Sequence, residues 1–272
     1  MQPRYVGLAG LGLLGSGIAR CLVEHGFHVI ALEKRDIAFE SGLFTRADGA
    51  AGLARCELVI ESITEDLEAK CALFEELEAQ VSSRVPIVSN TSAIPISLLQ
   101  AGRKHPQRFA GMHWAPPAYA TRFLEIIRGS ETDDPTIEYL VRMANDLDKE
   151  PAVVEKDVPG FVANRLAYAM YREALHMVEE GVADVAAIDL LCKNSLGLWT
   201  SLCGPFRWMD ITGGPALYAK AMERVFPTLS NETGVSEVMR RERFYDYGAD
   251  DAAQWQKKLH EHALKIWALG KP

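Results

Sequence analysis

Two side chains near the middle of the chain have the types and the spacing of a proton-transfer pair. His113 ends an apolar run that begins at Phe109, and Glu125 lies between Leu124 and Ile126 in the next run. Because side chains alternate along a strand, Leu124 and Ile126 would point to the face opposite Glu125. We therefore expect His113 and Glu125 to approach each other across two strands. A carboxylate bonded to one imidazole nitrogen leaves the other as a base, which suits removal of a hydroxyl proton during alcohol dehydrogenation.

Four further polar residues are expected near this pair. Glu65, Asn90 and Ser92 each follow a predicted strand, and Asn164 lies early in a long predicted helix. Ligands bind outside the carboxyl ends of the strands in a doubly wound sheet, so Ser92 is expected to bond the reacting oxygen and Asn164 to reach the same pocket. Structural explanations remain open for all of them: a strand-end histidine, a surface glutamate, turn residues before a helix, or a helix-start asparagine.

The stretch from Arg4 to Glu33 predicts a dinucleotide site. It contains a short apolar run, a G-x-G-x-x-G turn, a helical pattern and a second apolar run that ends on Glu33. A pyrophosphate would lie on free N–H groups at the helix N-terminus, and Glu33 would accept hydrogen bonds from the adenosine ribose. The predicted cofactor is NAD, held by Gly10, Leu11, Gly12, Leu13, Leu14, Gly15, Glu33 and Asn90. The alternative is a tight turn in another doubly wound fold. Glu33 would repel a ribose 2′-phosphate and so favour NAD over NADP, a preference that Lys34 and Arg35 could weaken.

Strand and helix patterns alternate through the first part of the chain. Strands are predicted at residues 5–9, 29–32, 57–60, 85–89, 109–113, 123–127 and 152–155. Residues 34–56 are expected to form a connection with one or two helical turns. Beyond Asp157 the periodicity is helical, at residues 161–180, 184–195, 216–226, 234–241 and 251–269. The predicted fold class is α/β: a Rossmann-type, doubly wound, mostly parallel sheet over residues 1–156, followed by an all-helical domain over residues 157–272.

Composition limits the classes of partner. The net charge is -8, which disfavours binding to the phosphates of a nucleic acid. No apolar run approaches the roughly 20 residues that span a bilayer, and the first predicted strand begins too early for a signal peptide. The five cysteines are scattered without a C-x-x-C pair, which is typical of reduced thiols and offers no metal site. We therefore expect a cytoplasmic protein that binds a small molecule, with neither nucleic acid nor membrane as a partner.

Eight motifs follow one another along the chain: GLGLLGSGIA, LVIESITEDLEAK, SNTSAI, GMHWAPP, FLEIIRG, VEKDVPGFVANR, EALHMVEEGVA and GPFRWMD. Through these motifs the chain resembles the 3-hydroxyacyl-CoA dehydrogenase family over nearly its whole length. The resemblance implies that His113 is the catalytic base and Glu125 its paired acid. It also implies that Ser92 touches substrate and cofactor, that Asn164 binds substrate, and that Glu65 and Lys70 lie near the nicotinamide. An all-helical C-terminal domain that forms a homodimer is implied as well.

Two departures from the family pattern concern the substrate. The family usually reads H-F-F-N-P after the fifth strand, whereas here Pro116 replaces the asparagine, which removes a polar side chain and a backbone donor. Family members that act on acyl-CoA carry a helical hairpin with CoA-binding lysines after the second strand. The segment from Glu33 to Glu57 is too short for that hairpin, although Lys34, Arg35 and Arg46 are possible substitutes.

The sequence therefore predicts an NAD-dependent oxidoreductase that acts on CH–OH groups and belongs by resemblance to fatty acid metabolism. Its expected reaction is oxidation of an L-3-hydroxy acid, or of its CoA thioester, to the 3-keto compound. One alternative substrate is a small non-CoA hydroxy acid, aldehyde or cyclic alcohol that carries a carboxylate. A non-catalytic NAD(H)-binding sensor is a further alternative. A 6-phosphogluconate-like dehydrogenase is disfavoured because the helix GFVANRLAYAMYREAL has no lysine.

Overall fold

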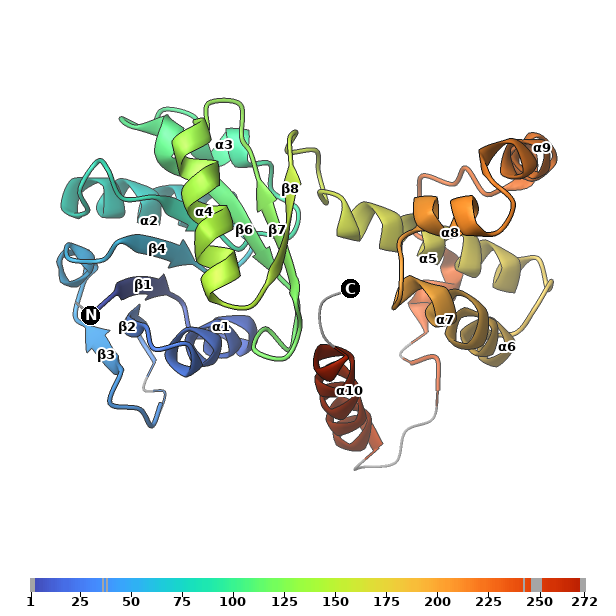
Figure 1. Ribbon diagram of the computed structural model, residues 1–272, viewed down its shortest axis with the longest axis horizontal. Coiled ribbons are helices and arrows are strands. Elements are labelled where there is room, and N and C mark those ends of the chain that lie inside the picture. Colours follow the sequence, from blue (N-terminus) through green and yellow to red (C-terminus); the bar gives the residue numbers. More distant parts are fainter. Residues whose placement is uncertain (1–2, 36, 38, 242, 246–250, 270–272) are drawn as a thin grey trace. The chain divides into compact units, whose positions relative to one another are not determined.

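The computed structural model describes residues 3–35, 37, 39–241, 243–245 and 251–269. The chain divides into two compact units (Figure 1). The first unit comprises residues 1–164 together with His260–Ala268, and the second comprises Arg165–Leu259 and residues 269–272. None of the described helices is long and apolar enough to cross a membrane.

The first unit is built on one eight-stranded sheet with the order β3-β2-β1-β4-β5-β6-β7-β8. The strands are β1 (Tyr5–Ala9), β2 (His28–Leu32), β3 (Phe44–Ala47), β4 (Leu58–Glu61), β5 (Ile87–Ser89), β6 (Phe109–Trp114), β7 (Phe123–Ile127) and β8 (Glu150–Val154). Neighbouring strands are parallel except β6 and β7, which pair antiparallel. The predicted Rossmann-type, mostly parallel sheet is therefore confirmed.

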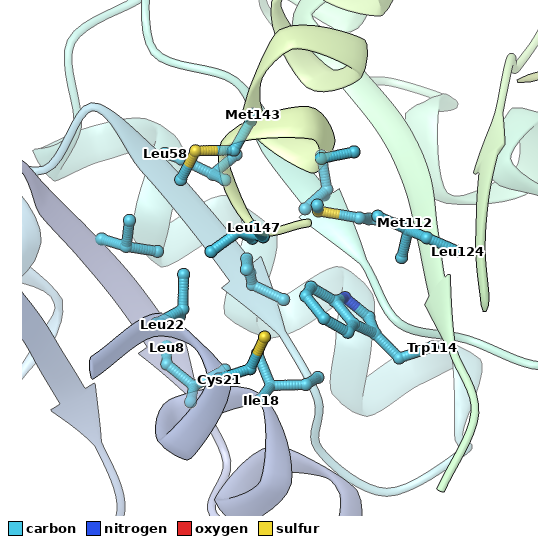
Figure 2. Close-up of a cluster of buried hydrophobic side chains, with 14 of the residues drawn as sticks. Leu8, Ile18, Cys21, Leu22, Leu58, Met112, Trp114, Leu124, Met143 and Leu147 are labelled. Carbon is cyan, nitrogen blue, oxygen red and sulfur yellow. The ribbon is translucent and has the colours of Figure 1, made fainter. Parts of the chain in front are cut away.

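Helices cover both faces of this sheet. Those of the first unit are α1 (Leu13–Glu24), η1 (Ala50–Leu53), α2 (Leu67–Gln80), α3 (Ile96–Gln100), η2 (Pro106–Arg108) and α4 (Asp134–Asp146). The apolar residues of α1 and α4 form one core with alternate residues of the strands (Figure 2). Those of α2 and α3 form a second core with the remaining strand residues. The two-residue period of each strand thus supplies both cores, as expected for a doubly wound fold.

Local sequence signals set several helix ends. Asp66, Asp133 and Asp184 each begin a helix by accepting a hydrogen bond from a backbone N–H in its first turn. At the other end of α1, Gly26 has a φ of 81°, a conformation that glycine adopts without strain. Such caps depend only on neighbours in the chain, because each is formed within one turn of the helix that it begins or ends.

The second unit is helical. Its elements are most of α5 (Ala163–Glu179), α6 (Val185–Leu191), the π-helical turn η3 (Cys192–Leu196), α7 (Gly197–Thr200), α8 (Pro205–Ile211), α9 (Pro215–Val225), η4 (Phe226–Thr228), η5 (Glu237–Arg240) and the first half of α10 (Asp251–Ala268). The helix predicted at residues 234–241 is only the short 3₁₀ turn η5. Helix α8 was not predicted, because its opening Gly204-Pro205 pair also suits a loop.

Two further differences from the sequence-based prediction concern the first unit. The segment 34–56 contains the edge strand β3 besides the helical turn η1. Its side chains at Thr45 and Arg46 are exposed, so it lacks the apolar alternation that marks a strand. In addition, the end of α10 groups with the sheet rather than with the predicted domain of residues 157–272. The contacts of Trp267 and His260 with the sheet unit account for this grouping.

Candidate active site

His113 and Glu125 lie directly opposite each other on the antiparallel strands β6 and β7. The imidazole Nδ1 of His113 is 2.7 Å from Oε2 of Glu125, and both side chains are buried. They share the sheet face opposite Trp114 and Leu124, which pack in the core of α1 and α4. Because Nδ1 is engaged by the carboxylate, Nε2 is the ring nitrogen that can exchange a proton with a substrate.

The second carboxylate oxygen of Glu125 lies at the start of α5. The backbone N–H groups of Val162 and Ala163 donate to Oε1 of Glu125 at 3.1 and 2.8 Å. Burial alone would raise the pKa of Glu125. The bond from His113 and the bonds from Ala163 and Val162 outweigh it, so the pKa of Glu125 lies below its ordinary value. The acid is therefore held ionised beside the imidazole.

Two aromatic rings border the histidine. The ring of Phe123 meets that of His113 edge to face, with centroids 5.6 Å apart, and the ring of Phe161 lies 5.8 Å away. Phe161 is fully buried, whereas Phe123 is partly exposed. The imidazole is thus held between a carboxylate and apolar walls, an arrangement that limits its access to water.

Ser92 and Asn164 meet through the backbone. The side-chain amide of Asn164 donates to the carbonyl oxygen of Ser92 at 3.0 Å. On the other side of the same loop, Oε1 of Glu65 accepts from the N–H of Ser92 at 2.9 Å and from the hydroxyl of Thr91 at 2.5 Å. Burial alone would raise the pKa of Glu65, but the Thr91 bond, the Lys70 charge and the backbone bonds lower it. The Ser92 loop is therefore held from two sides.

Lys70 is buried and forms ion pairs with one buried and one exposed acid. Its Nζ is 2.6 Å from Oε1 of Glu61 and 3.3 Å from Oε2 of Glu65. Glu61 also accepts from the hydroxyl of Ser89 at 2.5 Å and is fully buried. The sequence-based prediction did not include Glu61. The sequence pattern that could have indicated Glu61 is an acid at the end of an apolar strand, nine residues before a lysine on the following helix.

Asn90 connects two strand ends. Its Oδ1 accepts from the backbone N–H of Trp114 at 2.9 Å, and its Nδ2 donates to the hydroxyl of Ser62 at 3.1 Å. Trp114 follows His113 directly, and the peptide between Pro116 and Pro117 beyond it is cis. The predicted residue Asn90 therefore lies beside the backbone that carries the histidine.

The turn between β1 and α1 fits a dinucleotide. A Cβ on Gly15 would lie 2.1 Å from the carbonyl oxygen of Gly10, so the packing of helix on strand requires glycine there. A Cβ on Gly12 would meet no protein atom within 4 Å, so nothing in the protein itself demands a glycine at that position. An open, side-chain-free surface at a helix N-terminus is what a pyrophosphate requires. The residues present therefore fit NAD.

Glu33 lies at the end of this site. Its Oε2 accepts from the backbone N–H of Leu11 at 2.8 Å, which places the carboxylate beside the glycine turn. Arg35 donates to the same carboxylate from its backbone and its guanidinium, at 2.9 to 3.1 Å. Mainly through this side-chain bond, the pKa of Glu33 is lowered to about 2. The carboxylate is therefore ionised at any ordinary pH.

The connection after β2 is short and has no helix among its described residues. β2 ends at Leu32, β3 begins at Phe44, and the intervening described residues form turns and irregular backbone. Arg46 on β3 donates to the carbonyl oxygens of Glu33 and Arg35. The sequence analysis named three basic residues as possible substitutes for the CoA-binding lysines. Two of them, Arg35 and Arg46, are therefore bonded to groups just beyond the carboxyl end of β2.

The fold and the glycine turn are those of Rossmann-type NAD-dependent oxidoreductases, and comparison with known families narrows the class. The 3-hydroxyacyl-CoA dehydrogenase NAD binding domain matches residues 41–158, and the C-terminal domain of that family matches residues 160–256. The chain belongs to the 3-hydroxyacyl-CoA dehydrogenase family. It is an NAD-dependent dehydrogenase that acts on hydroxyl groups, as its sequence predicts.

Individual relatives fall into two groups. One is the 5-formyl-3-hydroxy-2-methylpyridine 4-carboxylate 5-dehydrogenase of Mesorhizobium japonicum, 30% identical over 87% of this chain and 84% of its own. The crystal structure of a 5-dehydrogenase for the same acid, an NAD+-dependent dismutase, has a TM-score of 0.90 and 25% identity, covering 98% of both chains. The other group includes the 3-hydroxybutyryl-CoA dehydrogenase of Bradyrhizobium diazoefficiens, 33% identical over 76% of this chain and 79% of its own.

Proposed function

We propose that this chain dehydrogenates an alcohol with His113 as the base and Glu125 as its paired acid. The observation that carries the proposal is the 2.7 Å contact between Nδ1 of His113 and the ionised Glu125 carboxylate. This contact fixes the tautomer in which Nε2 is a proton acceptor. The carboxylate then stabilises the imidazolium that forms when the hydroxyl proton reaches Nε2.

The remaining predicted residues have supporting roles in this proposal. Bound NAD supplies the acceptor for the hydride that leaves the carbinol carbon. The Ser92 hydroxyl bonds the reacting oxygen, and Asn164 orients the substrate while it holds the Ser92 loop. Glu65 lies by the nicotinamide end and positions the same loop, and Lys70 acts through Glu65. The turn from Gly10 to Gly15 binds the pyrophosphate, Glu33 binds the ribose, and Asn90 supports the strand ends.

The substrate we propose is a small cyclic or aromatic alcohol or aldehyde that carries a free carboxylate. The lack of a helix in the described residues between Leu32 and Phe44 supports a substrate without CoA. The partly exposed ring of Phe123 beside His113 suits a planar substrate. The similarity to a 5-formyl-3-hydroxy-2-methylpyridine 4-carboxylate 5-dehydrogenase, in sequence and in fold, points the same way.

An aldehyde would react as its hydrate. Water adds to the carbonyl carbon, the hydrate loses a hydride to NAD and a hydroxyl proton to His113, and the carboxylic acid results. The proton that His113 takes is therefore the same in alcohol and aldehyde oxidation. Two electrons leave the substrate as hydride in each case, and bound NAD would supply the acceptor.

An L-3-hydroxyacyl-CoA, or the free L-3-hydroxy acid, is the second candidate substrate. The family itself and the identity of 33% with 3-hydroxybutyryl-CoA dehydrogenases favour it. Activity on the thioester would connect the chain with fatty acid metabolism. Lys34, Arg35 and Arg46 would then have to supply the charge that the hairpin lysines supply in such enzymes.

One substrate panel separates these candidates. The purified chain is assayed by NADH absorbance with 5-formyl-3-hydroxy-2-methylpyridine 4-carboxylate and NAD, and with acetoacetyl-CoA, acetoacetate and other keto acids and NADH. We expect turnover with the aromatic acid and a value of kcat/KM for acetoacetyl-CoA that is at least about ten-fold lower. A preference for the CoA ester would overturn the proposed substrate. Tight NADH binding without turnover of any compound would favour a sensor.

We also propose that the helical unit forms a homodimer. Helices α5, α7, α8 and α9 contain no buried residue in the single chain. Large apolar side chains are exposed on them, including Leu166, Leu198 and Phe206. Exposed apolar surface of this extent is typical of a subunit interface.

A further inference from the structure

The end of α10 packs against the loop that joins the two catalytic strands. We call residues His260–Ala268 the C-terminal strap; they belong to the unit that contains the sheet. The guanidinium of Arg122 lies 4.7 Å from the ring centroid of Trp267, and its Nη2 donates to the carbonyl oxygen of Trp267 at 2.8 Å. Arg122 immediately precedes Phe123, the first residue of β7. The strap thus contacts the chain three residues before Glu125.

Lys149 links the strap to the other catalytic strand. Its Nζ lies 5.1 Å from the ring centroid of Trp267 and 5.2 Å from that of Trp114, which directly follows His113. The same Nζ donates to the carbonyl oxygens of Ala118 and Thr121, at 2.5 Å each. Burial lowers the pKa of Lys149, whose side chain is fully enclosed. The two indole rings and the two carbonyls, together with the Cys21 thiol, therefore form the environment of the lysine.

A third contact lies within the same loop. The hydroxyl of Tyr119 is 3.2 Å from Nδ1 of His260, and the Tyr119 ring carries the guanidinium of Arg20 on its face at 3.9 Å. A Cβ on Gly17 would lie 3.3 Å from that of Ala118, so the loop also packs closely on α1. The loop is therefore held by α1 on one side and by the strap at several points.

We infer that the C-terminal strap positions the His113–Glu125 pair by holding residues 115–122, an inference that rests on the function proposed above. The loop leaves β6 after Trp114 and enters β7 at Phe123, so its conformation sets how the two strands present their paired side chains. Trp267 is the central contact, because it meets both Arg122 and Lys149. The family match ends at residue 256, so the strap lies beyond the part of the chain that the family model covers.

Loss of Trp267 is expected to loosen this loop without reaching the dinucleotide turn. Lys149 would lose one of its two aromatic neighbours, and Arg122 would lose the ring on which it stacks. Small displacements of catalytic groups are costly, on the order of a hundred-fold in rate for an ångström. The expected effect is therefore a fall in kcat, with NADH affinity retained.

The test compares Trp267→Ala, Trp267→Phe and the wild type as full-length proteins. The control is Leu259→Ala, which removes an exposed apolar residue of the same helix from the other unit. For Trp267→Ala we expect kcat to fall roughly ten- to hundred-fold, NADH dissociation constants within about two-fold of wild type, and recovery of most of kcat in Trp267→Phe. Hydrogen exchange should accelerate in peptides covering residues 115–127, and the control should match the wild type in every measurement.

Unchanged kcat and unchanged exchange in Trp267→Ala would overturn the inference. Equal loss of NADH affinity and kcat, with no rescue by phenylalanine, would show a merely structural residue and overturn it as well. If Trp267→Ala does not fold, Tyr119→Phe replaces it. That change removes one hydroxyl contact to His260, and it must lower kcat and accelerate exchange in the same peptides. Hydrogen exchange needs no substrate, so it tests the strap separately from the proposed function. The inference about the strap can be contradicted while His113 remains the base, and it can be supported even if His113 is not the base.

Discussion

At the scale of single residues, His113 is defined by what its two ring nitrogens can do. Nδ1 is occupied by Glu125, which itself is held by two backbone N–H groups at the start of α5. An acid fixed in this way cannot rotate to accept the substrate proton itself. The geometry therefore divides the work, with Nε2 of His113 taking the proton and Glu125 stabilising the resulting charge.

Replacing His113 with glutamine tests this division. The side chain of His113→Gln keeps a polar group near Glu125 but cannot accept a proton at neutral pH. We expect kcat to fall on the order of 10²- to 10⁴-fold, the usual contribution of a general base, while NADH binds as in the wild type. Stopped-flow absorbance and NADH fluorescence titration measure the two quantities. Retention of full turnover would remove His113 from the mechanism.

Glu33 and Arg35 are expected to set the choice between NAD and NADP. The carboxylate repels a ribose 2′-phosphate, and the guanidinium that now bonds to Glu33 could instead bind such a phosphate. In Glu33→Ser we expect the ratio of kcat/KM for NAD over NADP to fall about ten- to hundred-fold, the size of one or two charge-assisted bonds. Steady-state kinetics with both cofactors measure the change.

The double variant Glu33→Ser with Arg35→Ser is the matched control. It lacks the repelling carboxylate and also the guanidinium, so it should gain less activity with NADP than the single variant. An equal gain in the two variants would show that Arg35 does not contact the phosphate. A wild type that already prefers NADP would contradict the role given to Glu33.

At the scale of elements, the site depends on the antiparallel pair formed by β6 and β7. β6 and β7 run in opposite directions, so His113 and Glu125 become direct neighbours, although eleven residues separate them in sequence. Helix α5 then begins on the second oxygen of Glu125. A single carboxylate therefore joins the sheet, the catalytic histidine and the first turn of the longest helix before α10.

Replacing Glu125 with glutamine should affect stability as well as activity. The amide retains one oxygen that can accept from the N–H groups of α5. It lacks the negative charge that interacts with His113 and with the start of α5. We expect the free energy of unfolding to fall by about 1–3 kcal/mol and kcat by at least about a hundred-fold. Urea denaturation and steady-state kinetics measure the two effects. Unchanged stability together with unchanged kcat would remove Glu125 from both roles.

The same substitution should change how stability depends on pH. The folded-state pKa of Glu125 is lower than its ordinary value of 4.5, so its contribution is fully present above that value. The contribution is lost as the pH falls through the lowered folded-state pKa. We expect the wild type to lose more stability than Glu125→Gln between neutral pH and the acid range, measured by denaturation at a series of pH values. Parallel curves would contradict the pKa assignment.

Local sequence could not predict every element. β3 is an edge strand whose side chains at Thr45 and Arg46 face solvent, so it has neither the apolar run nor the alternation of the inner strands. The buried strands were predicted because their apolar runs are set by two covered faces. Helix α8 was not predicted because a glycine followed by a proline can end one element or begin another.

At the scale of the whole molecule, the two units differ in how they bury their side chains. The sheet unit has two buried cores, whereas α5, α7, α8 and α9 have no buried residue in the single chain. Side chains as large as Phe206, which is 79% exposed, need another surface to leave water. A second copy of this chain is the partner that we propose for them.

Sedimentation velocity tests the dimer. We expect a dimer at micromolar concentration, and we expect Phe206→Glu to raise the dissociation constant by about ten-fold or more, because a charge would enter an apolar interface. Leu98→Glu, at an exposed position on α3 of the sheet unit, is the control and should remain dimeric. NADH affinity should not change in either variant. A wild type that sediments as a monomer would contradict the proposal.

The sequence alone determined the features that depend on near neighbours in the chain. These include the glycine turn with Glu33, the buried strands, the helix caps, and the residue types at His113 and Glu125. Only the tertiary structure decided which groups meet. The pairs His113–Glu125, Lys70–Glu61 and Arg122–Trp267 join residues that lie 9 to 145 positions apart. Such contacts arise from the packing of whole elements. No local sequence pattern predicts them, because the fold determines which side chains become partners.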